Sequence, residues 1–294
     1  MGEYRPMLAE LAPEPFDHQK FIFEPKWDGV RAIAYVENGH ARIIGRNGTD
    51  LTDRFPEFQG QFRIPWSMVL DGEIFCGEGT TADFPKIQER VHLQDAFRCR
   101  LRSQLMPATF AAFDVLEWNG ETLVRAPLAK RKMVLDKALP RSARVVHTQF
   151  IPEYGIAFFE AMAAAGYEGA MAKHLEGTYV QGKRSPLWQK FKVSRSDVFL
   201  AVGYTQGQGA REGTFGALVL ASQDEGRLVY RGEVGTGFAE EALREILAMA
   251  KDANPHFGIK GVHWIEPIRV RVKYLDTTED GKLRFPSFKG LEER

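Results

Sequence analysis

The sequence predicts two domains: an α+β domain over residues 1–195, then a small β-barrel domain over residues 196–294. Two observations predict this arrangement. Up to about residue 192, apolar strand-like runs are mixed with helical patterns of apolar residues at three- and four-residue spacing. Beyond it, short strand patterns alternate with glycine-rich turns. A length of 294 residues is ample for two such cores.

Strands and helices alternate in the first domain. Residues 21–50 read as strands, with Asn38-Gly39 as a hairpin turn. Residues 67–76 and 108–118 are two further strands, and the second stops at the turn residues Asn119-Gly120. Amphipathic helices are predicted over residues 128–139 and 155–169. The polar stretch 77–106 carries one helix near residues 84–93.

The boundary between the two domains lies within "VSRSD", residues 193–197. The strands of the second domain are "VFLAVGYTQ", "FGALVLAS", "RLVYRGEVGTG" and "WIEPIRVRVKYLD", with one helix before the last strand. This content suits a small barrel such as an OB-fold. In the last strand, basic residues alternate with apolar ones and share one face; they are Arg269, Arg271 and Lys273. Such a stripe suits a phosphate backbone, and the alternative is a solvated outer face.

Composition excludes several classes of protein. No apolar run approaches the roughly 20 residues of a membrane span, and the N-terminus lacks the shape of a signal peptide. Two cysteines cannot build a disulfide framework or a four-cysteine zinc site. We therefore expect a reduced, cytoplasmic protein that binds no membrane. A net charge of zero argues against a protein that binds nucleic acid through its overall charge alone.

Lys26 stands in "EPKWDGVRAIAY", a stretch that otherwise reads as a buried strand. A lysine becomes a nucleophile only when its amine is neutral. Burial and a neighbouring cation both lower a lysine pKa, and Arg31 could supply the second effect. The alternative is an ordinary charged strand end beside an Asp-Gly turn.

Three more residues have both a functional and a structural interpretation. Arg46, in the turn "GRNG", could form bidentate hydrogen bonds with phosphate or ribose, or could be a solvated arginine. Glu73 lies between apolar residues, so it needs a metal, a ribose hydroxyl or a salt bridge. Phe113 is a core residue or a stacking platform for a base, on the opposite strand face from Asp114.

The remaining candidates follow the second helix. Glu168 precedes Gly169 at a helix-to-strand turn, and Lys173 follows. Lys190 and Lys192 are two residues apart, so a strand directs both to one face, where a bound phosphate would relieve their repulsion. Together these residues favour nucleotidyl transfer. They offer an amine nucleophile, carboxylates for a divalent metal, cations for phosphate and an aromatic ring for a base. The sequence has no nucleophile elbow, no zinc-protease motif and no P-loop.

The order K-W-D-G-V-R, G-R-N-G, D-G-E, F-D-V-L, E-G-A-M-A-K and W-Q-K-F-K resembles the covalent nucleotidyltransferases, and within them the ATP-dependent DNA ligases. The spacing and the C-terminal half are most similar to the ligase domain of bacterial end-joining ligase D and its stand-alone relatives. The resemblance covers nearly the whole chain. It implies an adenylation (nucleotidyltransferase) domain followed by an OB-fold domain, hinged near Ser196-Asp197.

The resemblance also implies residue roles. Lys26 forms a lysyl-adenylate with ATP, and AMP passes to the 5′-phosphate of nicked duplex DNA before the 3′-hydroxyl seals the nick. For the base and sugar, the resemblance implies that Glu24 recognises the adenine amino group, Phe113 stacks on adenine, Lys173 binds the nucleotide, and Glu73 contacts ribose and metal. For the phosphates, it implies contacts from Arg31 and Arg46 to ribose and phosphates (including the nick 5′-phosphate), neutralisation of the α-phosphate by Lys190 and Lys192, and contact with pyrophosphate by Arg284 and Lys289. It further implies that Glu168 binds Mg²⁺ or Mn²⁺.

The tail departs from the pattern of the family. The family usually continues as Leu-Arg-x-Asp-Lys, whereas this chain reads Leu291-Glu292-Glu293-Arg294. The departure puts the efficiency of self-adenylation in question and leaves Arg284 or Lys289 for the pyrophosphate. We further expect the basic residues of the polar stretch to help hold the duplex; they are Arg98, Arg100 and Arg102. The alternative is an exposed loop–helix insertion with no role in DNA binding.

Other interpretations stay open from the sequence. An RNA ligase or an mRNA capping guanylyltransferase uses a similar lysine and the same carboxylates. A catalytically silent nucleic-acid-binding module on an OB-fold is the alternative outside enzymes. Ku or a repair polymerase are candidate partners of the ligase interpretation, and we expect a monomer.

Overall fold

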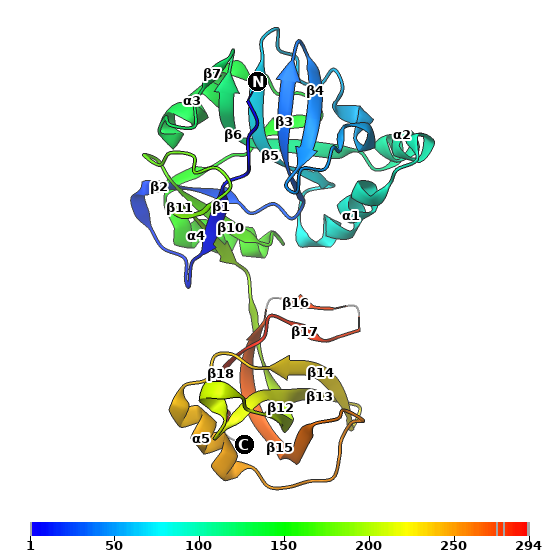
Figure 1. Cartoon of the computed structure of the whole chain (residues 1–294), viewed down its shortest axis with the longest axis vertical. Helices are drawn as coiled ribbons and strands as arrows, with labels where there is room; N and C mark the ends of the chain where they lie inside the picture. The colour runs from blue at the N-terminus through cyan, green and yellow to red at the C-terminus, as the bar shows by residue number, and fades with distance from the viewer. Residues whose placement is uncertain (1, 275, 279, 293–294) are drawn as a thin grey trace. The chain divides into compact units, whose positions relative to one another are not determined.

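The computed structural model describes residues 2–274, 276–278 and 280–292 (Figure 1). The chain divides into two compact units, Met1–Val193 and Ser194–Arg294. Each unit has its own buried apolar clusters, and each is described by itself below. Within the described residues, no helix is long and apolar enough to cross a membrane.

The first unit contains a five-stranded sheet in the order β1-β11-β10-β2-β9. Its strands are β1 (Leu8–Leu11), β11 (Arg184–Lys192), β10 (Gly169–His174), β2 (His18–Pro25) and β9 (Ile151–Glu153). β1 runs parallel to β11, and the other neighbours are antiparallel. The sheet thus brings the N-terminal strand beside the last strand of the unit.

The second sheet of this unit has the order β4-β3-β5-β6-β7, with β8 parallel to β6. Its strands are β4 (His40–Gly45), β3 (Val30–Glu37), β5 (Met68–Cys76), β6 (Ala108–Trp118), β7 (Glu121–Thr122) and β8 (Val145–His147). The predicted hairpin at Asn38-Gly39 is confirmed, because both residues have positive φ values, of 49° and 81°. One prediction was wrong: residues 21–36 are two strands, and Lys26 lies in the break between them.

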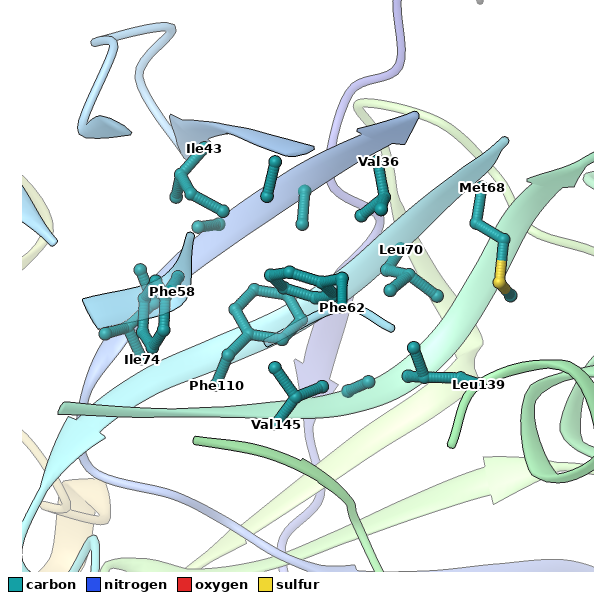
Figure 2. Close-up of a cluster of buried hydrophobic side chains, with 14 of the residues drawn as sticks. Val36, Ile43, Phe58, Phe62, Met68, Leu70, Ile74, Phe110, Leu139 and Val145 are labelled. Atoms are coloured by element: carbon teal, nitrogen blue, oxygen red, sulfur yellow. The ribbon is translucent and has the colours of Figure 1, made fainter. Parts of the chain in front are cut away.

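The largest apolar core of the unit packs against one face of this second sheet, as Figure 2 shows. Phe58 and Phe62 reach it from the segment between β4 and β5, where the short 3₁₀ helices Thr52–Arg54 and Pro56–Phe58 lie. Both rings meet Phe110 of β6 edge-on, with centroids 6.2 and 5.7 Å away. The core holds the sheet rigid, so side chains on its other face have fixed positions.

In the described part of the first unit, four α-helices accompany the sheets: α1 (Phe84–His92), α2 (Ala96–Leu105), α3 (Leu128–Ala138) and α4 (Gly155–Ala164). The predicted helix near residues 84–93 is confirmed as α1. Helix α2 was not predicted; Asp95 caps it by accepting a hydrogen bond from the Arg98 amide at 2.8 Å. Its apolar residues Phe97 and Leu105 are exposed, so its pattern was not that of a core-facing helix.

The second unit is built on an antiparallel sheet in the order β14-β13-β12-β15-β18. Its elements are β12 (Arg195–Gln206), a 3₁₀ turn Gly209–Arg211, β13 (Phe215–Asp224), β14 (Arg227–Val234), α5 (Glu240–Met249), β15 (Val262–Tyr274), the small pair β16 (Asp276–Thr277) and β17 (Leu283–Arg284), and β18 (Ser287–Leu291). Along β15 the predicted alternation is confirmed: Ile268, Val270 and Val272 are buried while Arg269 is exposed.

Candidate active site

A cavity of about 180 Å³ lies within the first unit. Residues of both sheets line it, together with the segment that leads into β1. Most of the predicted site residues are brought together here; those that line the cavity are Glu24, Lys26, Arg31, Arg46, Glu73, Phe113, Lys173 and Lys190. Residues from six strands therefore converge on one small space.

Lys26 follows the last residue of β2, and its amide donates a hydrogen bond to the Gly169 carbonyl at 3.0 Å. Its ammonium contacts a carboxylate oxygen of Glu168, and the other oxygen lies 2.6 Å from the Lys192 ammonium. Burial alone would raise the pKa of Glu168, but the two lysines outweigh it and lower that pKa. Glu168 therefore bridges Lys26 and Lys192 as an ionised group.

Lys190 and Lys192 lie two residues apart on β11, as predicted. Burial lowers the pKa of Lys190, and repulsion from Lys192 and Lys26 adds to the effect. Lys26 and Lys190 line the cavity, and Lys192 joins them through Glu168, the carboxylate that pairs with both Lys26 and Lys192. The surplus positive charge suits an anionic ligand.

Arg31 lines the cavity and is paired with a buried carboxylate. Its guanidinium forms a two-pronged pair with Asp71, with Nε–Oδ1 and Nη2–Oδ2 distances of 2.5 and 2.6 Å. Asp71 is fully buried and also accepts a hydrogen bond from the Tyr179 hydroxyl. The Arg31 guanidinium lies 4.4 Å from the centroid of the Phe113 ring. Arg31 is therefore held in one place against the cavity wall.

Asp71 and Tyr179 were missed as supporting residues. Asp71 belongs to "VLDGEIF" in the predicted strand 67–76 and lies in the middle of β5, but no supporting role was predicted for it. A buried aspartate within an apolar strand needs a charged or hydrogen-bonding partner, so the signal was present. For Tyr179, which lies outside the strands, the sequence offered no comparable signal.

Glu24 is also buried and lies between two lysines. Its carboxylate is 2.6 Å from the ammonium of Lys173, and the ammonium of Lys132 from α3 contacts the other oxygen. Lys173 lies 4.0 Å from the centroid of the Phe113 ring and 4.2 Å from that of Trp188. Burial lowers the pKa of Lys173 to about 8, although Glu24 opposes the shift. Lys132 and Trp188 were not predicted.

Phe113 is both a core residue and a cavity residue. It is 6% exposed, packs edge-on against Trp188 and still lines the cavity. Its neighbour Asp114 points to the opposite side and pairs with the buried Arg131 at 2.7 Å, so the predicted division of faces is confirmed. Arg46 is exposed at the cavity rim, and its amide donates to the Arg31 carbonyl at 3.0 Å.

Glu73 is the second carboxylate that a divalent cation could use. Burial raises its pKa to about 7, although Arg31 and Lys26 oppose the shift. Glu168 is close enough to add to the rise by repulsion. No cluster of three or more candidate ligands exists among the described residues. Glu73 in the cavity and Glu168 beside Lys26 nevertheless fit Mg²⁺, which is usually bound by one or two carboxylates and keeps several waters.

The predicted residues of the second unit are surface residues. Arg269, Arg284 and Lys289 are exposed. Arg271 pairs with Glu292 through an Nε–Oε1 distance of 2.5 Å, so one member of the basic stripe is neutralised. The residues Glu293 and Arg294 of the altered tail lie outside the described residues.

A lysine bridged to a carboxylate, further lysines on the adjacent strand, and an aromatic wall beside a buried glutamate define a nucleotidyltransferase-type site. The sequence profile described as "ATP dependent DNA ligase domain" matches residues 6–192, and the profile "ATP dependent DNA ligase C terminal region" matches residues 211–294. The chain belongs to the ATP-dependent DNA ligases. Its fold is the adenylation domain and C-terminal OB-fold domain of that family.

Individual relatives agree with this assignment. The chain is 31% identical to the multifunctional non-homologous end joining protein LigD of Mycolicibacterium smegmatis over 304 residues, covering 98% of this chain and 38% of that protein. It is 35% identical to a DNA ligase of Methanoculleus marisnigri over 260 residues, covering 84% and 46%. The solved structure of mycobacterial DNA ligase D complexed with ATP and MES superposes with a TM-score of 0.56 at 25% identity, covering 98% of this chain and 95% of that one. The chain spans less than half the length of the two curated relatives.

Proposed function

We propose that this chain seals nicks in duplex DNA with ATP through an AMP intermediate on Lys26. The observation that carries the proposal is the position of Lys26. Its ammonium lies in a cavity that also holds Glu24, Phe113 and Lys190, with Lys192 in the same ion-pair network. A nucleophile, an aromatic wall for the base and cations for the phosphates are thus brought together in one region of the first unit.

In the first step the Lys26 amine attacks the α-phosphorus of ATP. The new P–N bond forms as the P–O bond to pyrophosphate breaks, and the amine proton leaves toward solvent or Glu168, the carboxylate in contact with it. Lys190 and Lys192 neutralise the charge on the α-phosphate oxygens. Fixed cations around an in-line phosphoryl transfer provide most of its catalysis.

The nucleotide is held by the other cavity residues. Phe113 stacks on the adenine, and Glu24 accepts a hydrogen bond from its amino group. Glu73, Arg31 and Arg46 face the ribose and phosphates. Asp71 supports this arrangement, since it fixes the direction of the Arg31 guanidinium.

Mg²⁺ or Mn²⁺ would be held by Glu73 and Glu168. When bound, the cation withdraws charge from the phosphate oxygens and so makes phosphorus more electrophilic. Glu73 must be ionised for this role, and the fields of Arg31 and Lys26 favour its ionised form.

DNA is the second substrate. AMP passes from Lys26 to the 5′-phosphate of the nick, aided by Arg46, and the 3′-hydroxyl then displaces AMP. Arg269 and Lys273 on β15 carry the phosphate contacts of the second domain, while Arg271 contributes less because Glu292 neutralises it. Arg284 serves the pyrophosphate during the first step, with Lys289 as the second candidate.

The helix α2 offers a further duplex contact. Arg98 and Arg100 are exposed on it, whereas Arg102 pairs with Glu89 at 2.5 Å. We assign the first two to the DNA backbone. Replacing them together with alanine lowers nick affinity and its salt dependence, and unchanged values would exclude this contact.

The pathway we propose is end joining in the cytoplasm, because several relatives are named for it. The chain would act as a monomer, with Ku or a repair polymerase as partners. The domain boundary at residues 193–197 serves as the hinge that reorients the OB-fold domain between steps.

Nick closure tests the proposed activity. A duplex with one 5′-phosphorylated nick is incubated with Mg²⁺ and either ATP or GTP, beside a nicked RNA duplex and Lys26→Ala protein. Closure of DNA with ATP, lost in the variant, is the expected result. Preference for GTP indicates a capping-type enzyme, and preference for RNA indicates an RNA ligase. No closure of any substrate, including a pre-adenylated DNA nick, would refute the proposal.

A further inference from the structure

Lys132 is a buried lysine that the resemblance leaves without a role. It lies on α3, is 7% exposed, and its ammonium contacts Oε1 of Glu24. Lys173 contacts Oε2 of the same carboxylate at 2.6 Å. Each oxygen of Glu24 therefore has one ammonium beside it, and the carboxylate is 1% exposed.

The two lysines approach Glu24 from different sides. Glu24 and Lys173 line the cavity that holds Lys26, whereas Lys132 lines a separate cavity of about 490 Å³ beside α3. Lys132 thus supports the carboxylate from behind and is not placed to touch a nucleotide itself.

Two ammonium groups, one beside each oxygen, balance the negative charge of the buried Glu24 carboxylate and restrict its orientation. An ionised carboxylate can only accept hydrogen bonds. Facing the 6-position of a purine, it pairs with the amino group of adenine and opposes the carbonyl oxygen of hypoxanthine or guanine. Without Lys132, the buried Oε1 would lose its charged partner, and the carboxylate would be free to turn toward Lys173.

We propose that Lys132 is a positioning residue that sets the base specificity of the nucleotide site by holding Glu24 as an oriented hydrogen-bond acceptor. The inference rests on the proposed function, since it assumes that Glu24 faces the base of ATP. Lys132 acts through Glu24 and is not a catalytic residue.

The test compares self-adenylation with ATP and with inosine triphosphate, which carries a carbonyl in place of the amino group. The quantity measured is the ratio of kcat/KM for the two nucleotides at a fixed pH. Lys132→Met lowers this ratio about tenfold or more, as expected for a hydrogen bond to a charged group. Lys132→Arg keeps the charge and stays near the wild-type ratio. Lys130→Met, an exposed lysine on the same helix, is the matched control and leaves the ratio unchanged.

The ratio of kcat/KM for ATP and 2′-deoxyATP separates a specific effect on the base from a general loss of structure. This ratio reports on the ribose, so we expect the same value in Lys132→Met as in the wild type. Thermal melting and closure of a pre-adenylated nick establish that the variants are folded. If Lys132→Met does not fold, Lys132→Gln takes its place with the same expected direction. An unchanged ratio in a folded Lys132 variant, or an equal loss in Lys130→Met, overturns the inference. Wild-type protein that is not adenylated by either nucleotide refutes the proposed function instead.

Discussion

Replacing Asp71 with asparagine tests whether the Arg31 pair is a structural support of the site. The side chain of Asp71 is fully buried, accepts two hydrogen bonds from Arg31 and takes a third from Tyr179. Asparagine keeps the shape but removes the charge, so the guanidinium loses the carboxylate with which it is paired. Breaking a buried ion pair in this way costs about 3–5 kcal/mol of folding free energy. We expect self-adenylation to fall as well, because Arg31 loses its fixed direction.

The assay is urea unfolding followed by tryptophan fluorescence. Four of the five tryptophans precede residue 193, so the signal reports mainly on the first unit. Asp50→Asn is the matched control, since Asp50 and Arg42 form an exposed pair with a 3.0 Å Nε–Oδ2 distance that is worth about 0–1 kcal/mol. A loss below about 1 kcal/mol in Asp71→Asn would refute the reasoning, because that is the range expected of the surface pair.

Three further outcomes follow from the charges of the site. Burial raises the pKa of Glu73 to about 7 from its ordinary 4.5, so between these pH values the folded chain holds a proton that the unfolded chain has released. As pH rises from about 4.5 to about 7, the unfolding free energy of the wild-type chain therefore falls by about 1–3 kcal/mol relative to that of Glu73→Gln. Urea titrations at several pH values measure both free energies, and curves of unfolding free energy against pH that run parallel for the two proteins would contradict the prediction. A double variant with Arg269→Ala and Lys273→Ala binds nicked DNA with a log affinity that depends less steeply on log salt concentration, by about 2 in the slope. An unchanged slope would show that these two residues do not contact the DNA phosphates. Removing divalent cations with EDTA stops self-adenylation and added Mg²⁺ restores it, whereas activity that persists in EDTA excludes the metal assigned to Glu73 and Glu168.

The residues that converge on the cavity were predictable because their chemistry stands out locally. Lys26 interrupts a strand-like pattern, and Lys190 and Lys192 have a period of two that directs both to one face. The alternation along β15 likewise followed from strand geometry. Patterns of this kind depend only on neighbours in sequence.

The supporting residues could not be predicted in the same way, because their partners are distant in the chain. Lys132 on α3 meets Glu24 on β2, and Tyr179 meets Asp71 on β5. The pairing of Arg271 with Glu292 also depends on β18 lying beside β15. In each case tertiary packing determines which residue becomes the ion-pair or hydrogen-bond partner. The type of a residue alone does not reveal that partner.

The most direct test of the central claim is where AMP becomes attached. The full chain is incubated with Mg²⁺ and ATP labelled at the α-phosphate, denatured, digested and mapped, with Lys26→Ala alongside. The account predicts label on the peptide that contains Lys26, none on the variant, and discharge of the label when nicked duplex DNA is added. Label that survives in Lys26→Ala, or that maps to another residue, would contradict it.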